Sequence, residues 1–257
     1  MERPNGFRGP RSPILMAGEG RAWWEAGSLL RDPVWRGDGV PDGDGRPVLL
    51  IPGFLAGDGS LGLLTRWLRA RGYWTSRSQI RVNADCVHEA LMRVEGRLEA
   101  LTERTGQKAA IVGQSRGGTM AKMLAIRRPD LISRIVALGS PNLAPLAVSP
   151  LVRGHIELVA ALGHAGVPGL FREECLRGEC SERLWAEMTQ PFPSGVAYTA
   201  VYSRTDGVVD WRACLDPAAE HVEVRSSHVG MSAHPDVYRV LGERLAKGAR
   251  RATGVAG

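Results

Sequence analysis

The sequence predicts an α/β fold with a mostly parallel, doubly wound sheet, and three observations carry this prediction. Short apolar runs of strand length alternate along the chain with longer stretches whose apolar residues recur every three or four positions. Strands that alternate with helices form parallel sheets, because right-handed crossovers place the helices on both faces. The chain has 257 residues, 44% hydrophobic and 23% charged, so it suits one large domain better than two small ones.

The pattern divides the chain near residue 46. Residues 1–46 are rich in Gly, Pro, Arg and Asp and show no sustained periodicity, so we expect an irregular N-terminal arm without a functional role. We expect the arm to dock through Trp23, Trp24 and Trp35. Residues 47–257 are expected to form the α/β domain.

Strands and helices can be placed along that domain. The run PVLLIPGF is apolar until Pro-Gly ends it, which is typical of a strand buried on both faces. Glycine or proline marks the ends of the helical patterns. The predicted strands span residues 47–54, 73–82, 108–114, 133–140, 195–203 and 221–226. The predicted helices span residues 60–72, 85–105, 116–128 and 235–247.

Residues 141–195 interrupt the alternation. This segment has many Pro and Gly residues and two amphipathic stretches, at 149–164 and 181–188. An insertion of this size between strands indicates a helical lid over the strand ends.

The motif Gly113-Gln114-Ser115-Arg116-Gly117 lies between a predicted buried strand and a predicted helix. A serine in such a turn sits on a tight elbow, and small flanking residues let strand and helix approach each other. Its hydroxyl then projects above the sheet as a nucleophile. The alternative is a glycine-rich loop without chemistry, but the strand and helix on either side favour the catalytic interpretation.

A serine hydroxyl needs an imidazole to accept its proton. Among the six histidines, His228 is favoured because it follows a predicted strand and precedes the last helix, on a loop at the same sheet edge as Ser115. The other five are assigned to the lid, to a helix, to the last strand or to a helix start. They are His88, His155, His164, His221 and His234.

The segments IPGF, VGQSRGG, TDGVVD and SSHVGM occur in the order in which the α/β-hydrolase superfamily carries its functional residues. From about Pro47 to Lys247 the chain resembles that superfamily, especially its compact bacterial lipases and esterases. Pro52 and Arg116 depart from the pattern, since many members have His at the first position and many lipases have an apolar residue at the second. The resemblance implies the α/β-hydrolase fold and a Ser-Asp-His triad.

Two aspartates compete for the acid, because Asp206 and Asp210 share one loop after a predicted strand. Asp206 lies closest to the strand end and matches the superfamily's D-x-x-V pattern through Val209. Asp210 is expected to cap a helix that begins near Trp211. The predicted triad is therefore Ser115, Asp206 and His228.

The oxyanion formed when serine attacks a carbonyl requires two backbone donors. The Arg116 amide follows the nucleophile and begins a helix, whose dipole adds to the stabilisation. The Phe54 amide follows Pro52-Gly53 in the loop that corresponds to the superfamily's oxyanion loop. We expect these two amides to form the oxyanion hole.

The expected reaction is hydrolysis of a carboxylic ester through an acyl-enzyme, without a metal or an organic cofactor. The same triad would serve a thioesterase, an acyltransferase or a perhydrolase, and a non-catalytic binding protein is a further alternative. The aliphatic residues of the lid either form an acyl pocket or simply pack its helices. These residues are Leu151, Ile156, Leu158, Val159, Leu162 and Phe171.

Charge and cysteine content exclude other classes. The net charge is +6, but Lys and Arg are scattered, with a short cluster at Lys247, Arg250 and Arg251, so we expect a solvated surface and no nucleic-acid partner. No apolar run reaches the length of a membrane span or a signal peptide, which favours a cytoplasmic location. Free thiols are expected, although a disulfide could close the Cys175–Cys180 loop. No C-x-x-C or paired-His spacing supports a zinc site for Cys86, Cys175, Cys180 or Cys214.

Overall fold

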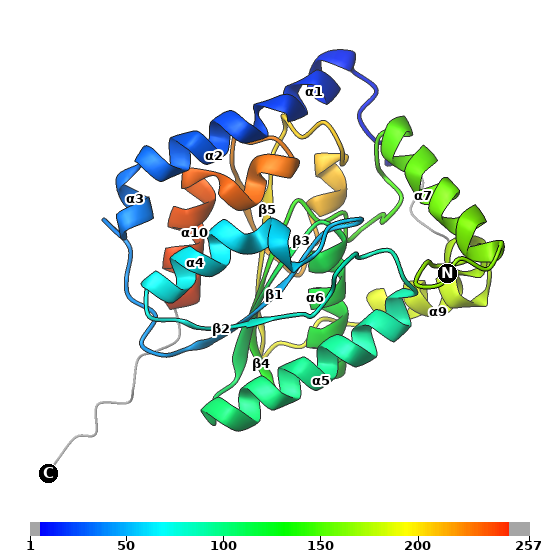
Figure 1. Ribbon diagram of the computed structural model, residues 1–257. Coiled ribbons are helices and arrows are strands. Elements are labelled where there is room, and N and C mark those ends of the chain that lie inside the picture. The colour runs from blue at the N-terminus through cyan, green and yellow to red at the C-terminus, as the bar shows by residue number, and fades with distance from the viewer. Residues whose placement is uncertain (1–5, 247–257) are drawn as a thin grey trace, which may run out of the picture.

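The computed structural model describes residues 6–246. It contains one sheet of six parallel strands in the order β2-β1-β3-β4-β5-β6 (Figure 1). All six predicted strands are confirmed, each between one and six residues shorter than predicted. They are β1 (Pro47–Ile51), β2 (Trp74–Arg77), β3 (Ala109–Gln114), β4 (Ile132–Leu138), β5 (Ala197–Tyr202) and β6 (Glu220–Glu223). The basic cluster at Lys247, Arg250 and Arg251 lies outside the described residues.

The central strands are buried on both faces, as their continuous apolar runs predict. Every residue of β1 and of β3 is buried. Side chains alternate between the two faces, so that Leu49 and Ile111 join one core while Leu50 and Val112 join the other. A doubly covered parallel sheet follows from this arrangement.

Helices cover both faces of the sheet (Figure 1). The core on one face is closed by α5 and α6, and the core on the other face by α4 and α10. All four helices predicted for the domain are therefore confirmed, although a 3-10 turn forms the start of the segment predicted for α4. Their bounds are α4 (Gly62–Ala70), α5 (Val87–Thr105), α6 (Arg116–Arg127) and α10 (Pro235–Ala246).

The N-terminal arm differs from the expectation of an irregular segment. It forms helices that run along the α10 side of the molecule (Figure 1), namely α1 (Pro13–Gly18), a 3-10 turn (Glu19–Arg21), α2 (Ala22–Arg31) and α3 (Pro33–Arg36). Trp23 and Trp24 are 88% and 75% exposed, so they do not dock the arm. Leu29 and Val34 enter the core instead, and Trp35 packs on Tyr238. A 3-10 turn and Pro33 divide the arm into helices of 6, 10 and 4 residues, so no single apolar period runs through it.

The segment at residues 141–195 is helical, and α7 and α9 match its two predicted amphipathic stretches. Its helices are α7 (Pro150–His164), α8 (Glu174–Arg177) and α9 (Glu179–Met188). Among the described residues, no helix is long and apolar enough to cross a membrane.

Candidate active site

Ser115 occupies the turn between β3 and α6 in a strained backbone conformation. Its φ of 51° and ψ of −122° lie in a region that residues other than glycine rarely adopt. Ser115 is the residue before the first turn of α6, and its amide donates to the Leu138 carbonyl over 2.7 Å. The local sequence therefore forms the sharp elbow that the motif predicts.

The glycines of the motif are required by close approaches of the backbone. A Cβ atom on Gly113 would lie 2.3 Å from the Gly117 carbonyl oxygen, and one on Gly117 would lie 2.2 Å from the Ile51 carbonyl oxygen. Both distances are well inside van der Waals contact. Only glycine, which has no side chain, therefore allows β1, β3 and α6 to approach one another this closely and form the turn.

His228 and Asp206 form a buried pair. The His228 Nδ1 atom lies 2.7 Å from Asp206 Oδ2, and the two side chains are 9% and 1% exposed. The other carboxylate oxygen, Asp206 Oδ1, accepts the amides of Val208 and Val209 at 2.8 and 2.7 Å. Asp206 is thereby held by its own loop, and it binds the imidazole nitrogen that faces away from a nucleophile in known triads.

The pKa of His228 lies above its ordinary value of 6.5. Burial is the largest influence and lowers this pKa, but the charge and hydrogen bond of Asp206, together with the charge of Glu19, raise it further than burial lowers it. The pair therefore stabilises the imidazolium form, as a general base requires once it has accepted a proton.

Backbone contacts bring His228 to the elbow. The Gln114 Nε2 atom donates to the His228 carbonyl oxygen over 3.0 Å, so the residue before Ser115 holds the residue that carries the imidazole. Ser115 and His228 line the same cavity of about 730 Å³. Within the described residues the Ser115 hydroxyl makes no hydrogen bond, so serine and histidine share the cavity without being bonded in this conformation.

The two amides expected to bind an oxyanion lie beside the serine. Phe54 and Arg116 line the same cavity as Ser115, and a Cβ atom on Gly53 would lie 3.3 Å from the Ser115 Cβ. In residues 6–246, neither the Phe54 nor the Arg116 amide donates a hydrogen bond. Both donors are thus free for a ligand at the serine.

The Arg116 side chain departs from the apolar residue of many lipases, and it contacts the segment before α5. Its guanidinium donates to the Asp85 carbonyl and lies 5.5 Å from the centre of the Phe171 ring. Burial lowers the pKa of Arg116 to about 10, against the opposing effect of the thiols Cys175, Cys86 and Cys180. The guanidinium therefore keeps its positive charge at neutral pH.

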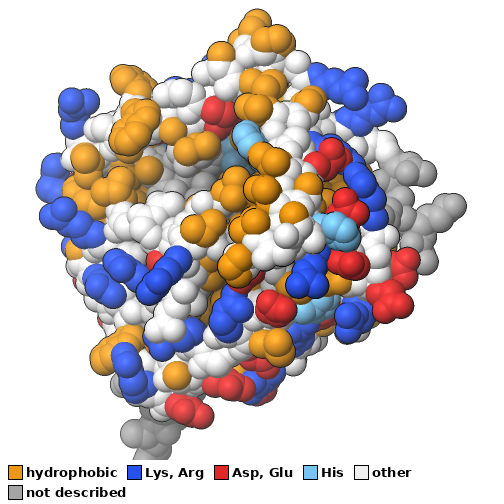
Figure 2. Space-filling model, turned by 45° about the vertical axis from the view of Figure 1, so that its right-hand side comes forward, with side chains coloured by type: hydrophobic (Ala, Val, Ile, Leu, Met, Phe, Trp, Pro, Cys, Tyr) orange, Lys and Arg blue, Asp and Glu red, His pale blue; other side chains and the backbone are white. Residues whose placement is uncertain are grey.

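The cavity walls are largely apolar and come from the 141–195 segment and the loop after β1. Figure 2, in which the α7 side of the molecule comes forward, shows hydrophobic side chains gathered on this face. Of the six aliphatic and aromatic residues expected at an acyl pocket, Ile156 and Phe171 line the cavity. Leu151, Leu158 and Leu162 are exposed instead, by 60%, 56% and 42%.

The sequence analysis missed two carboxylates of the N-terminal arm that hold the loops of the site. Glu19 accepts the amides of Gly207, His228 and Val229 at 2.7, 3.0 and 2.9 Å. Glu25 is buried and accepts the amide of Ser227 at 2.8 Å as well as the hydroxyl of that residue. The flanking residues of both Asp206 and His228 are therefore anchored by the arm. No local motif in the sequence predicts these contacts, because about 200 residues separate the partners.

The competing residues take other positions. Asp210 caps the 3-10 helix Trp211–Cys214 by accepting the Arg212 amide, as expected. His221 lies in β6 and contacts the Asp216 carbonyl, and His234 precedes α10. His155 lines the cavity from α7, but no carboxylate of the described residues pairs with it.

Comparisons with known proteins agree on the fold. No protein-family profile matches the chain, and no curated protein matches it by sequence. Solved structures do match. A metagenomic carboxyl esterase superposes with a TM-score of 0.61 at 14% identity, over 89% of this chain and 91% of its own. The mature lipase of Bacillus licheniformis gives 0.58 at 14% identity, over 81% and 96%. A monoacylglycerol lipase of Paleococcus ferrophilus gives 0.54 at 16% identity, over 80% and 96%.

The sheet order, the serine elbow and these superpositions define the class of protein. The chain has the α/β-hydrolase fold, and it resembles bacterial lipases and esterases in structure. At identities of 14–16% the resemblance shows the fold alone. What the site does must therefore be argued from its own residues.

Proposed function

We propose that the protein is a serine hydrolase that cleaves carboxylic esters through an acyl-enzyme. The observation that carries the proposal is one cavity that presents Ser115 on a strained elbow beside His228, whose other nitrogen is paired with buried Asp206. That constellation suits the transfer of an acyl group to serine. The named activities of the similar structures, carboxyl esterase and lipase, point to the same chemistry.

Each residue has a defined part in the proposed reaction. His228 Nε2 takes the proton of the Ser115 hydroxyl as the oxygen attacks the ester carbonyl, and the Phe54 and Arg116 amides bind the resulting oxyanion. His228 then returns the proton to the departing alcohol, which leaves Ser115 acylated. Water, activated by the same imidazole, releases the acid. Asp206 stabilises the imidazolium throughout without taking its proton.

The size and apolar lining of the cavity suit a substrate whose apolar part is an acyl group of moderate length. Its volume of about 730 Å³ lies within the range of ligand pockets, about 300–1,000 Å³, and side chains of α7 and α9 line it. We propose that the 141–195 segment acts as the lid of this acyl pocket.

A panel of p-nitrophenyl esters of increasing acyl length tests this proposal. The wild-type protein should hydrolyse them with an optimum in chain length, and Ser115→Ala should retain only background hydrolysis with an unchanged melting temperature. Turnover by Ser115→Ala at the wild-type rate would refute the role of Ser115. A wild-type protein that is inactive on the whole panel, but transfers or binds acyl groups, would favour an acyltransferase or a binding protein instead.

A further inference from the structure

Three cysteines that are far apart in the sequence meet beside the candidate active site. Cys86 precedes α5, Cys175 lies in α8 and Cys180 lies in α9, and their three sulfur atoms all lie within 4.8 Å of one another. The Cys86 and Cys180 sulfurs are 3.7 Å apart, and the Cys175 and Cys180 sulfurs are 3.5 Å apart. All three thiols are free and half-buried. Neither the proposed hydrolase activity nor the α/β fold requires three thiols at one place.

The sulfur spacing distinguishes between two kinds of thiol site. A disulfide requires an S–S separation of about 2.05 Å, and it would leave the third thiol unused. Three sulfurs around one tetrahedral zinc ion, each at a Zn–S distance of about 2.3 Å, lie about 3.8 Å from one another. The observed separations of 3.5 and 3.7 Å are close to that value.

The charge around the cluster also suits a cation with three thiolates. A zinc ion with three thiolate ligands carries a net charge of −1, which needs a positive neighbour when partly buried. The Arg116 guanidinium donates to the carbonyl of Asp85, the residue directly before Cys86, and no carboxylate of residues 6–246 pairs with it. Arg116 therefore places an uncompensated positive charge beside the cluster.

We infer that Cys86, Cys175 and Cys180 bind a zinc ion. Each thiol releases its proton to solvent and forms one Zn–S bond, and a water molecule completes the tetrahedron. The ion joins α8 and α9 to the start of α5, and so fixes part of the cavity wall, since Cys175 and Leu176 line the cavity. The site lies outside the proposed triad, so the inference does not depend on the proposed function.

Metal analysis of the full chain, purified under reducing conditions, tests the site. The protein should take up about one equivalent of Zn²⁺, and Co²⁺ in its place should give the sulfur-to-cobalt charge-transfer band and intense visible bands of tetrahedral thiolate coordination. Cys86→Ser and Cys180→Ser should abolish both signals and lower the melting temperature of the zinc-loaded protein. Cys214→Ala is the matched control, because Cys214 is a buried thiol outside the cluster, and it should keep the metal.

The zinc site would be overturned by a disulfide or by a failure of the metal-binding test. The disulfide would be Cys175–Cys180 or Cys86–Cys180, shown by peptide mass spectrometry of the protein as isolated. The failure would be a reduced protein that takes up no Zn²⁺ or Co²⁺, or that binds either metal equally well after Cys86→Ser. Because metal content is the readout, a failed esterase assay would leave this test intact.

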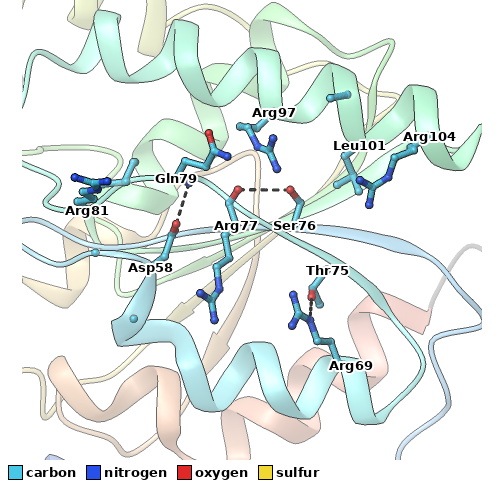
Figure 3. A pocket seen from close by; sticks show the side chains of 14 residues that line it. Asp58, Arg69, Thr75, Ser76, Arg77, Gln79, Arg81, Arg97, Leu101 and Arg104 are labelled. Carbon is cyan, nitrogen blue, oxygen red and sulfur yellow. Dashed lines mark hydrogen bonds between the residues drawn. The ribbon is translucent and has the colours of Figure 1, made fainter.

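A second, independent observation is an arginine-rich cavity lined in part by α5. It has a volume of about 950 Å³ and lies at the free edge of β2, between α4 and α5 (Figure 3). Figure 3 shows Arg97 and Arg104 extending from α5 and Arg69 from α4. The five arginines that line it are Arg69, Arg77, Arg81, Arg97 and Arg104.

These arginines lack acidic partners. Among the described residues none of the five forms an ion pair. Arg69 donates to the Thr75 hydroxyl and Arg104 lies over the Trp74 ring, while the buried Nε of Arg97 has no hydrogen-bond partner. The one acidic residue of the lining, Asp58, accepts hydrogen bonds from Ser78 and from the Gln79 amide, so it fixes the loop after β2. The fold thus brings five arginines that are scattered along the sequence into one cavity.

We propose that this cavity binds a small molecule bearing two or more phosphate groups. Planar guanidinium groups recognise phosphate oxygens bidentately, and a concave site with several arginines and one engaged acid favours a multiply charged anion. The volume admits such a molecule but not a folded partner.

Calorimetric titration at constant physiological ionic strength tests this site with tripolyphosphate and with ATP. Both should bind saturably, and Arg97→Gln should weaken binding about tenfold, as the loss of a charged hydrogen bond predicts. Arg31→Gln, which removes an exposed arginine outside the cavity, should have no effect. Tighter binding of ATP than of tripolyphosphate would identify a nucleotide as the ligand, and equal binding a free polyphosphate. The site would be refuted by no binding, by equal weakening in Arg31→Gln, or by binding of long nucleic acids alone.

Discussion

At the scale of single residues, the structure distinguishes clearly between the two aspartates that compete for the role of triad acid. Asp206 and Asp210 lie four positions apart in one loop, yet only Asp206 contacts the His228 imidazole, while Asp210 caps a 3-10 helix. The structure therefore distinguishes the carboxylate that pairs with the imidazole from the one that caps a helix.

Exchange of each aspartate for asparagine should separate those two roles. Asp206→Asn should lower kcat by up to about 10⁴-fold with little change in fold, because the amide favours the wrong imidazole tautomer. Asp210→Asn should cost about 1 kcal/mol of unfolding free energy as a weakened cap, with kcat largely kept. Turnover and melting temperature of both variants check this. The reverse pattern would exchange the two assignments.

The raised pKa of His228 predicts where activity is lost in acid. Only neutral imidazole accepts the serine proton, so kcat/KM should fall as the pH falls through a pKa above 6.5. In Asp206→Asn the charge that raises this pKa is gone, and the acid limb should move to lower pH. Asp210→Asn should leave the limb in place. A pH profile of kcat/KM for the three proteins measures this, and an unshifted limb in Asp206→Asn would contradict the pairing.

At the scale of elements, the sequence predicts the strands well and the arm poorly. The six strands and the four helices of the domain follow from apolar periodicity and from the Gly and Pro residues that bound them, because each is long enough to show its pattern. The elbow at Ser115 is predictable for the same reason, since strand, motif and helix are contiguous. Contacts between distant segments, such as Glu19 with the His228 amide or Cys86 with Cys180, leave no local signal.

The arm should act as a positioning element for the candidate site. Glu19→Ala removes the acceptor of three loop amides and one of the charges that raise the pKa of His228. We expect a lower kcat, a smaller change in KM, and an acid limb displaced to lower pH. Glu103→Ala, which removes an exposed carboxylate of α5, is the control of equal charge. If kcat and the pH profile of Glu19→Ala match those of the control, the arm merely covers the core.

At the scale of the whole molecule, the sheet brings the three candidate residues together at the carboxyl ends of its strands. Ser115 follows β3, Asp206 follows β5 and His228 follows β6, so three residues spread over 114 positions meet where parallel strands end. Ligands of open α/β sheets bind outside those carboxyl ends. Side chains of residues 141–195 and Phe7 of the arm line the cavity beside these strand ends.

The central claim is that Ser115 is an activated nucleophile, and covalent labelling tests it most directly. A fluorophosphonate probe reacts with serine only where a base activates the hydroxyl. We predict stoichiometric labelling of the native protein, located by peptide mass spectrometry at Ser115 and lost in both Ser115→Ala and His228→Ala. His221→Ala and His234→Ala should label normally. A native protein that stays unlabelled, or a label that persists in Ser115→Ala, would contradict the account.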